Sequence, residues 1–326
     1  MMDRRAFIRS LSGAAILTPV AARAQKQSKR ARVGLLMTTT PAAASHIVVA
    51  FTDELRELGH LEGKNVVFEY RWAAGRPERL AELAAELVQQ HVDVIVASSQ
   101  AAALAAKRVT TSVPIVMVNA ADPVAAGLVG SLSRPGGNVT GLSQQLTPEI
   151  RAKQLQLLKE MVTKASRVSV LRSPATSVGL QEYETAGRAL ALQIVVFDVR
   201  DPDELPRVFT AMSRDRVDSM VVPADPFLFT ERHRVTQLAQ EHRLPSMCST
   251  REFAEAGGLM SYSARLTEQF RRAAVYVDKI LRGASPATLP IESPGQYELV
   301  INLKTAKAIG LSIPLSLLQR ADHVIE

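Results

Sequence analysis

The 326-residue sequence predicts an α/β protein of two lobes, each a parallel sheet flanked by helices, with a ligand-binding cleft between them. Short apolar, β-branched runs alternate with amphipathic helices over most of the chain, a pattern typical of parallel sheets covered on both faces. The stretch 114–142 divides this pattern into two similar halves. Its turn segment RPGGN at 134–138 precedes a fresh strand, which suits a crossing between lobes.

The first half consists of repeated strand–helix units. Strands are predicted at 32–37, 66–70, 92–97 and 115–118. The first helix is expected to be capped by Ser45 and to end at Leu58, before a glycine. Ligands on such sheets bind at the carboxyl ends of the strands. We therefore expect the loops 38–40, 98–100 and 119–122 to face the cleft.

The second half repeats the pattern. Helices are predicted at 148–161, 180–192, 205–212, 231–242 and 266–282, and strands at 167–171, 194–197, 219–222, 246–249, 257–262 and 297–303. The tail is long enough to cross back between the halves. We assign 32–142 and 263–292 to an N-terminal lobe, 143–262 and 293–326 to a C-terminal lobe, and the hinge to 132–142, 262–263 and 291–295.

Residues 1–24 predict an export signal peptide, followed by a linker at 25–31. Paired arginines at 4–5 precede a modest apolar region at 11–20, and Ala22-Arg23-Ala24 fits a small-x-small cleavage site after Ala24. The apolar region is too short for a permanent membrane-spanning helix. The arginine pair is similar to a twin-arginine signal, with a general secretory signal as the alternative. Either route predicts a periplasmic protein.

The net charge of +7 does not predict a nucleic-acid-binding protein. Residues 1–24 carry three net positive charges and residues 25–32 carry four, so the remainder of the chain is neutral. A neutral body lacks the basic footprint that nucleic-acid binding requires.

The sequence contains no motif that predicts an enzyme, a cofactor site or a metal site. No G-x-G-x-x-G follows the first strand, and the sequence lacks a Walker lysine motif, G-x-S-x-G and H-E-x-x-H. Its six histidines are scattered. The single cysteine, Cys248, excludes an intramolecular disulfide and is expected to be a buried small hydrophobe.

Several strings together resemble the TrpX-like substrate-binding protein family of ABC importers. They are GHLEGKNV at 59–66, PIVMV at 114–118, DPV at 122–124, SRPGGNVTG at 133–141, GGLMSY at 257–262 and NLKTAKAIGL at 302–311. The resemblance covers the chain from about Arg32 to Glu326. It implies a type I periplasmic-binding-protein fold, a cleft that closes on its ligand, and transport without catalysis. Some members of the family are associated with aromatic amino acids.

The strand ends supply the candidate ligand-binding residues, which are Thr38, Thr39, Thr40, Ser98, Ser99, Gln100, Asn119, Asp122, Thr176, Asp225, Phe227 and Tyr262. The 98–100 segment can hold a carboxylate at a helix start, or it can be an ordinary helix cap. Asp225 can pair with an ammonium group or simply initiate a turn before Pro226. Phe227, Tyr262 and Trp72 can supply an aromatic wall, although packing or a place at the cleft rim is favoured for Trp72.

We therefore expect an extracytoplasmic, monomeric importer component that captures an amino acid or aromatic acid and delivers it to an ABC permease in the inner membrane. A periplasmic sensor that signals to a membrane receptor is the alternative, with the same fold and site. An enzyme would need a catalytic constellation. A sugar-responsive repressor would need a DNA-binding segment where the export leader lies.

Overall fold

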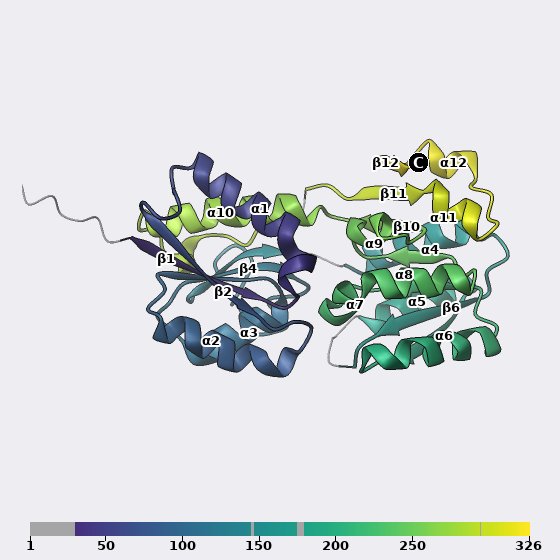
Figure 1. Ribbon diagram of the computed structural model, residues 1–326, viewed down its shortest axis with the longest axis horizontal. Coiled ribbons are helices and arrows are strands. Elements are labelled where there is room, and N and C mark those ends of the chain that lie inside the picture. Colours follow the sequence, from purple (N-terminus) through teal and green to yellow (C-terminus); the bar gives the residue numbers. More distant parts are fainter. Residues whose placement is uncertain (1–29, 145–146, 175–178, 294) are drawn as a thin grey trace, which may run out of the picture.

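The computed structural model describes residues 30–144, 147–174, 179–293 and 295–326, arranged as two lobes side by side (Figure 1). The signal peptide predicted at 1–24, most of the linker, and the candidate residue Thr176 lie outside this range. Each lobe is a sheet with helices on both faces, so the predicted two-lobed α/β class is confirmed.

The first lobe contains a five-stranded parallel sheet in the order β2-β1-β3-β4-β5. Its strands are β1 (Ala31–Met37), β2 (Val66–Trp72), β3 (Val94–Ala97), β4 (Ile115–Ala120) and β5 (Val139–Ser143). Helices α1 (Pro41–Glu57) and α10 (Leu266–Leu281) pack together on one face, and η1 (Pro77–Arg79), α2 (Leu80–Gln89) and α3 (Gln100–Val109) lie on the other (Figure 1). The chain therefore returns from the second lobe to supply α10.

The second lobe contains a seven-stranded sheet in the order β12-β11-β10-β9-β8-β6-β7. Its strands are β6 (Arg167–Arg172), β7 (Gln193–Asp198), β8 (Ser219–Val222), β9 (Ser246–Cys248), β10 (Met260–Ser263), β11 (Glu298–Asn302) and β12 (His323–Ile325). The prediction of a wholly parallel sheet is wrong for one pair, because β11 runs antiparallel to β10. After β10 the chain crosses to the first lobe, forms α10 there and crosses back to form β11. It therefore enters the second sheet again from the opposite direction.

Helices of the second lobe complete its layers. They are α4 (Pro148–Met161), α5 (Leu180–Ala189), α6 (Leu205–Arg214), α7 (Pro226–Thr230), α8 (Arg232–Glu241), α9 (Arg251–Glu255), α11 (Leu303–Ala308) and α12 (Leu315–Leu318), with the short turn η2 (Pro202–Glu204). The short turn η3 (Pro286–Thr288) instead contacts β5 of the first lobe. The short helices α7 and α9, which follow β8 and β9 directly, are absent from the sequence prediction.

Helix α1 begins earlier than predicted. Thr40, not Ser45, is its N-cap, and the Thr40 side chain accepts a hydrogen bond from the Ala43 N–H. Pro41 occupies the first helical turn, where a missing N–H costs nothing and the fixed φ suits the helix. The cap and the proline thus move the start of the helix to the end of the β1 loop.

Three segments connect the lobes. β5 leads toward α4, β10 leads into α10, and the chain after η3 leads into β11. Two of them touch: the Ser143 and Ser293 hydroxyls lie 3.3 Å apart, and Leu142 pairs with Glu292 in an isolated parallel bridge. β5 and β10 each continue one residue beyond the lobe boundaries assigned from the sequence, to Ser143 and Ser263.

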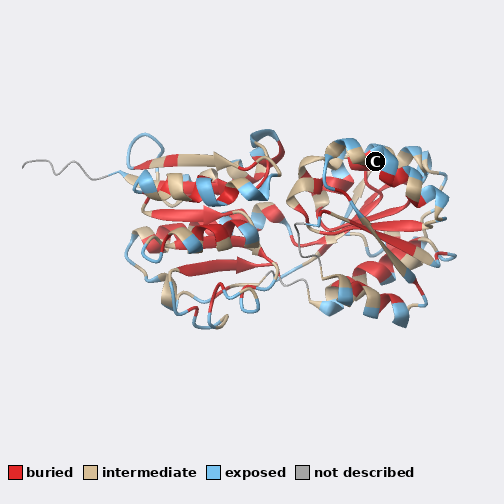
Figure 2. Ribbon diagram, turned by 90° about the horizontal axis from the view of Figure 1, so that it is seen from below, coloured by how far each residue is buried: buried red, intermediate tan, exposed pale blue. Residues whose placement is uncertain are grey.

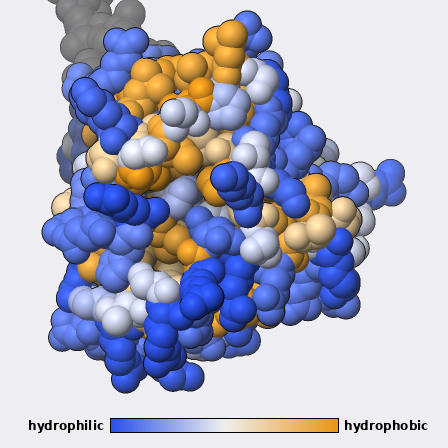
Figure 3. All heavy atoms as spheres, turned by 90° about the vertical axis from the view of Figure 1, so that its right-hand side faces the viewer, coloured by the Kyte–Doolittle hydropathy of each residue, from blue (hydrophilic) through white to orange (hydrophobic). Residues whose placement is uncertain are grey.

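The core of each lobe lies along its sheet. Figure 2 shows buried strands at the centre of both lobes and helices whose outer faces are exposed. Cys248 is fully buried, as predicted, and burial raises the pKa of its thiol to about 12. The outer end of the second lobe, seen in Figure 3, mixes polar surface with smaller apolar patches. No helix in the described part of the chain has the length and apolarity needed to cross a membrane.

Candidate ligand-binding site

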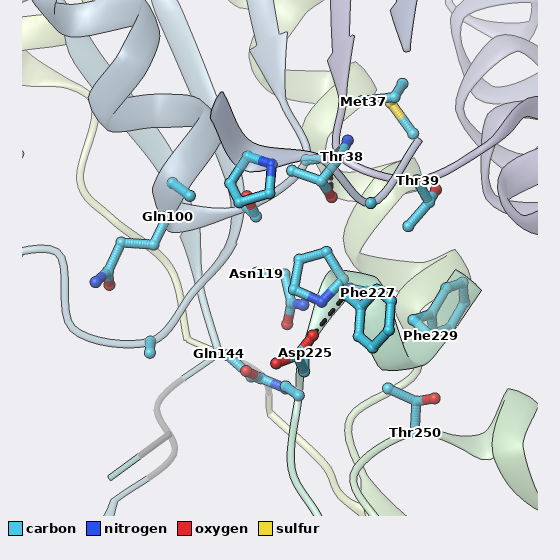
Figure 4. A pocket seen from close by; sticks show the side chains of 18 of the residues that line it. Met37, Thr38, Thr39, Gln100, Asn119, Gln144, Asp225, Phe227, Phe229 and Thr250 are labelled. Carbon is cyan, nitrogen blue, oxygen red and sulfur yellow. Dashed lines mark hydrogen bonds between the residues drawn. The ribbon is translucent and has the colours of Figure 1, made fainter. Parts of the chain in front are cut away.

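A cavity of about 310 Å³ lies between the two lobes (Figure 4). Its walls come from the carboxyl ends of β1, β3 and β4 in the first lobe and of β8 and β9 in the second, together with α7 and α10. This volume is at the lower end of the range of about 300–1,000 Å³ that is typical of ligand pockets. The cavity therefore has the size and position of a small-molecule site on two facing parallel sheets.

The structure brings together eight of the twelve candidate residues around this cavity. They are Thr38, Thr39, Ser98, Ser99, Gln100, Asn119, Asp225 and Phe227. They come from both lobes because the carboxyl ends of parallel strands meet at one edge of each sheet, and these two edges face each other.

Three described candidates do not line the cavity. Thr40 caps α1, and Asp122 is exposed and accepts a hydrogen bond from the Ala125 N–H. Tyr262 instead stacks on Tyr297, with ring centroids 5.7 Å apart, and packs against the second-lobe core. Trp72 also lies away from the cavity lining and stacks on Tyr70 at 6.0 Å.

The first-lobe wall is held by hydrogen bonds between two strand-end loops. The Thr38 N–H donates to the Ser98 hydroxyl at 3.0 Å, and the two hydroxyls lie 3.2 Å apart. Ser99 is the N-cap of α3, and its side chain accepts from the Ala102 N–H at 3.1 Å. Ser99 therefore acts as an ordinary helix cap. The positive N-terminal end of α3, a ten-residue helix, lies at the cavity.

Asp225 forms the polar part of the second-lobe wall. Its carboxylate caps α7 by accepting hydrogen bonds from the Phe227 N–H at 2.9 Å (Figure 4) and from the Leu228 N–H at 3.1 Å. The other carboxylate oxygen accepts from the Ser173 N–H at 2.9 Å. Asp225 is only 3% exposed. Its carboxylate is thus fixed in one orientation while it borders the cavity.

Several lining residues lie outside the sequence-based set. The apolar ones include Ile47, Leu80, Leu104, Leu266, Phe229 and Phe270, and the polar ones are Gln144, Arg151, Ser173 and Thr250. Thr250 lies two residues after the end of β9, so the strand-end rule that selected the other candidates applies to it as well. The helical residues carry no such sequence signal, because the way the lobes meet decides which helix face borders the cavity.

Arg151 adds a positive charge to the cavity wall. Its side chain is 6% exposed, its Cζ lies 5.8 Å from the centroid of the Tyr183 ring, and its Nη1 is 3.9 Å from the carboxylate of Glu182. Arg151 and Asp225 are the charged side chains among the described lining residues. The cavity therefore combines one guanidinium, one carboxylate and an apolar, partly aromatic surface.

His46 and Glu252 form a contact across the cleft. His46 lies on α1 and Glu252 on α9 of the other lobe, and the imidazole Nε2 is 3.0 Å from the carboxylate Oε1. Burial alone raises the pKa of Glu252, but hydrogen bonds from His46 and the backbone outweigh it, so that the net pKa lies below its ordinary value. The pair favours the arrangement in which the lobes are together.

This contact predicts an acid-dependent loss of stability. Because the folded-state pKa of Glu252 is depressed, its contribution is present above the ordinary value of 4.5 and is lost as pH falls through the folded value. Thermal unfolding at about pH 7 and about pH 3 should show Glu252→Gln to be destabilising by about 1 kcal/mol at the higher pH and by clearly less at the lower one, where the pH has fallen toward the folded-state pKa. An equal destabilisation at both pH values would contradict the assignment.

Comparison with known proteins places the chain in a family. Residues 33–325 match the family model described as ABC transporter substrate binding protein. The chain belongs to this family. A tyrosine-binding protein of Clostridioides difficile (strain R20291) is 24% identical over 286 residues, which cover 87% of this chain and 82% of the relative.

Solved structures agree with the family assignment. A Streptococcus pneumoniae ABC domain in complex with L-Trp is 27% identical, with a TM-score of 0.84, and the match covers 91% of this chain and 100% of that one. A conserved domain protein of Vibrio cholerae gives the same identity, TM-score and coverage. The resemblance to a TrpX-like substrate-binding family is thereby confirmed.

Proposed function

We propose that this protein is the substrate-binding component of an ABC importer and that it captures an amino acid with an apolar or aromatic side chain. The observation that carries the proposal is the composition of the cavity between the lobes. It presents a buried carboxylate at Asp225, a buried guanidinium at Arg151, and the aromatic side chains Phe227, Phe229 and Phe270. A zwitterion with an apolar side chain complements all three features.

Each ligand group has a matching wall. The ammonium group would lie against Asp225, because a fixed carboxylate in a site shielded from water favours a cation. The carboxylate would lie toward Arg151 and the positive end of α3, where Ser98 and Ser99 add hydroxyl groups. The side chain would fill the aromatic part of the cavity. The ligands named for two relatives, tyrosine and L-Trp, each have an ammonium group, a carboxylate and an aromatic side chain, which would fit these three parts of the wall.

Closure of the lobes couples binding to transport in this proposal. The ligand contacts both lobes only when they are together, so it stabilises the closed state by its differential affinity. The hinge would be formed within the segments expected from the sequence, by the described residues around 142, 262–263 and 291–293. The closed form would then present both lobes to a membrane permease.

The proposal includes export and a periplasmic location. Residues 1–24 would direct the chain across the inner membrane by the twin-arginine or the general secretory route, with cleavage after Ala24. The mature chain would act as a monomer, without catalysis or a cofactor. No cluster of histidine, cysteine or acidic residues suited to a metal occurs among the residues that the structure describes.

A thermal-shift screen of residues 25–326 tests the proposal. A ligand that binds only the folded state stabilises it by about 2.7 kcal/mol at a hundredfold excess over its Kd. We expect stabilisation by tryptophan, tyrosine, phenylalanine or a branched amino acid, and none by sugars or purines. Stabilisation by a sugar or a purine alone would refute an amino-acid ligand.

A further inference from the structure

Strand β4 is irregular where it reaches the cavity. Its pairing with β5 shifts register between Met117 and Ala120. Between these residues Asn119 has a φ of 60°, in the left-handed region. Non-glycine residues are uncommon there, and asparagine is one of the few that tolerate it. A bulge of this kind changes the direction in which a side chain leaves the strand.

Gly141 on β5 makes the bulge possible. Its φ is 125°, and a Cβ at this position would lie 2.2 Å from the carbonyl oxygen of Met117 and 2.8 Å from its nitrogen. Any side chain would therefore displace the β4 backbone at Met117, two residues before Asn119. Gly141 itself does not line the cavity, so it acts on the site only through the position of β4.

The bulge leaves an unsatisfied acceptor at the cavity. Asn119 lines the cavity, and its side-chain Oδ1 is buried and accepts no hydrogen bond from the residues that the structure describes. A buried polar atom without a partner is costly. A strained backbone and an unpaired acceptor at one residue are explained together if a ligand supplies the missing donor.

We propose that Asn119, positioned by the β4 bulge and Gly141, accepts a hydrogen bond from the ligand's ammonium group and thereby selects α-amino acids over the corresponding acids without an amine. The inference rests on the proposed function and adds a specificity determinant to it. Asp225, which borders the same cavity from the other lobe, provides the second acceptor (Figure 4). Two acceptors from opposite lobes make the ammonium group a bridge that favours closure.

Calorimetric titration of residues 25–326 tests this selection. The probes are L-tryptophan, L-tyrosine and L-phenylalanine, each paired with its des-amino acid: 3-indolepropionate, 3-(4-hydroxyphenyl)propionate and 3-phenylpropionate. The wild-type protein should bind at least one amino acid and bind its des-amino partner at least tenfold more weakly. Equal binding within a pair would overturn the inference and leave the proposed function standing.

Variants at Asn119 separate its side chain from its backbone. Glycine accepts the left-handed φ, so Asn119→Gly should fold normally and weaken amino-acid binding by about ten- to a hundredfold, as expected for a hydrogen bond to a charged group. Binding of the des-amino acid should change little. Asn119→Asp retains an acceptor and should weaken amino-acid binding less than Asn119→Gly. Unchanged affinity in Asn119→Gly would overturn the inference.

Gly141→Ala tests the positioning role. It should weaken amino-acid binding more than des-amino binding, because it displaces Asn119. Gly137→Ala is the matched control, since a Cβ there meets no atom within 4 Å, and it should leave both affinities unchanged. If Gly141→Ala does not fold, Asn119→Gly decides the question alone. Failure of the wild-type protein to bind any of the six probes would overturn both the inference and the proposed amino-acid ligand.

Discussion

Replacing Asp225 by alanine is expected to abolish amino-acid binding and to lower the free energy of unfolding by about 2–4 kcal/mol. The carboxylate is buried and accepts hydrogen bonds from three backbone N–H groups, those of Ser173, Phe227 and Leu228. Its removal leaves these donors unsatisfied, uncaps α7 and deletes the proposed partner of the ammonium group. Chemical denaturation and calorimetric titration measure the two effects.

Two further variants distinguish these roles. Asp122→Ala changes another aspartate that precedes a proline, but Asp122 is exposed and does not line the cavity, so we expect little effect on binding. Asp225→Asn can retain part of the cap while it loses the charge, so it should lose affinity more than stability. Amino-acid binding by Asp225→Ala at wild-type strength would contradict the assignment.

Phe270→Ala is expected to cost about 3–5 kcal/mol of stability and to weaken ligand binding at least tenfold. Phe270 lies in the second turn of α10, is 1% exposed, and both packs in the core and lines the cavity. The substitution would therefore remove part of the ligand's aromatic wall as well as core packing. Denaturation midpoints and Kd values give the two quantities separately.

Phe209→Ala is the matched control for this prediction. Phe209 is fully buried on α6 but does not line the cavity. It should cost a similar free energy of unfolding while leaving the Kd unchanged in conditions where the variant is folded. An equal loss of affinity in both variants would show that the effect of Phe270 on binding is a general consequence of lower stability.

The repeated strand–helix pattern was sufficient to predict the fold and much of the cavity. Thr38, Ser98 and Asn119 follow strands β1, β3 and β4 or end them, and parallel strands bring their carboxyl ends to one edge. The same reasoning located Asp225 after β8. The positions of these four residues depend on where the strands end and on their parallel direction, and the alternation of apolar runs with helices predicts both.

Other features depend on information that a periodic pattern lacks. Tyr262 lies within β10, and its ring is directed to the stack with Tyr297 and not to the cleft, because the strand register decides which face a side chain occupies. Arg151 and Phe270 border the cavity from helices whose facing sides are set by how the lobes meet. The bulge at Asn119 adjoins a close approach of β4 to Gly141 on another strand, which a periodic pattern does not contain.

The proposed function requires that the ligand bind between the lobes. A crystal structure of residues 25–326 with the amino acid that gives the largest thermal shift tests it most directly. We predict ligand density in the inter-lobe cavity, with the ammonium group between Asn119 and Asp225 and the side chain against Phe227. A second cavity lies at the lobe connections, lined in part by Gln269, Arg272 and Glu292. Density there, with the inter-lobe cavity empty, would contradict the claim.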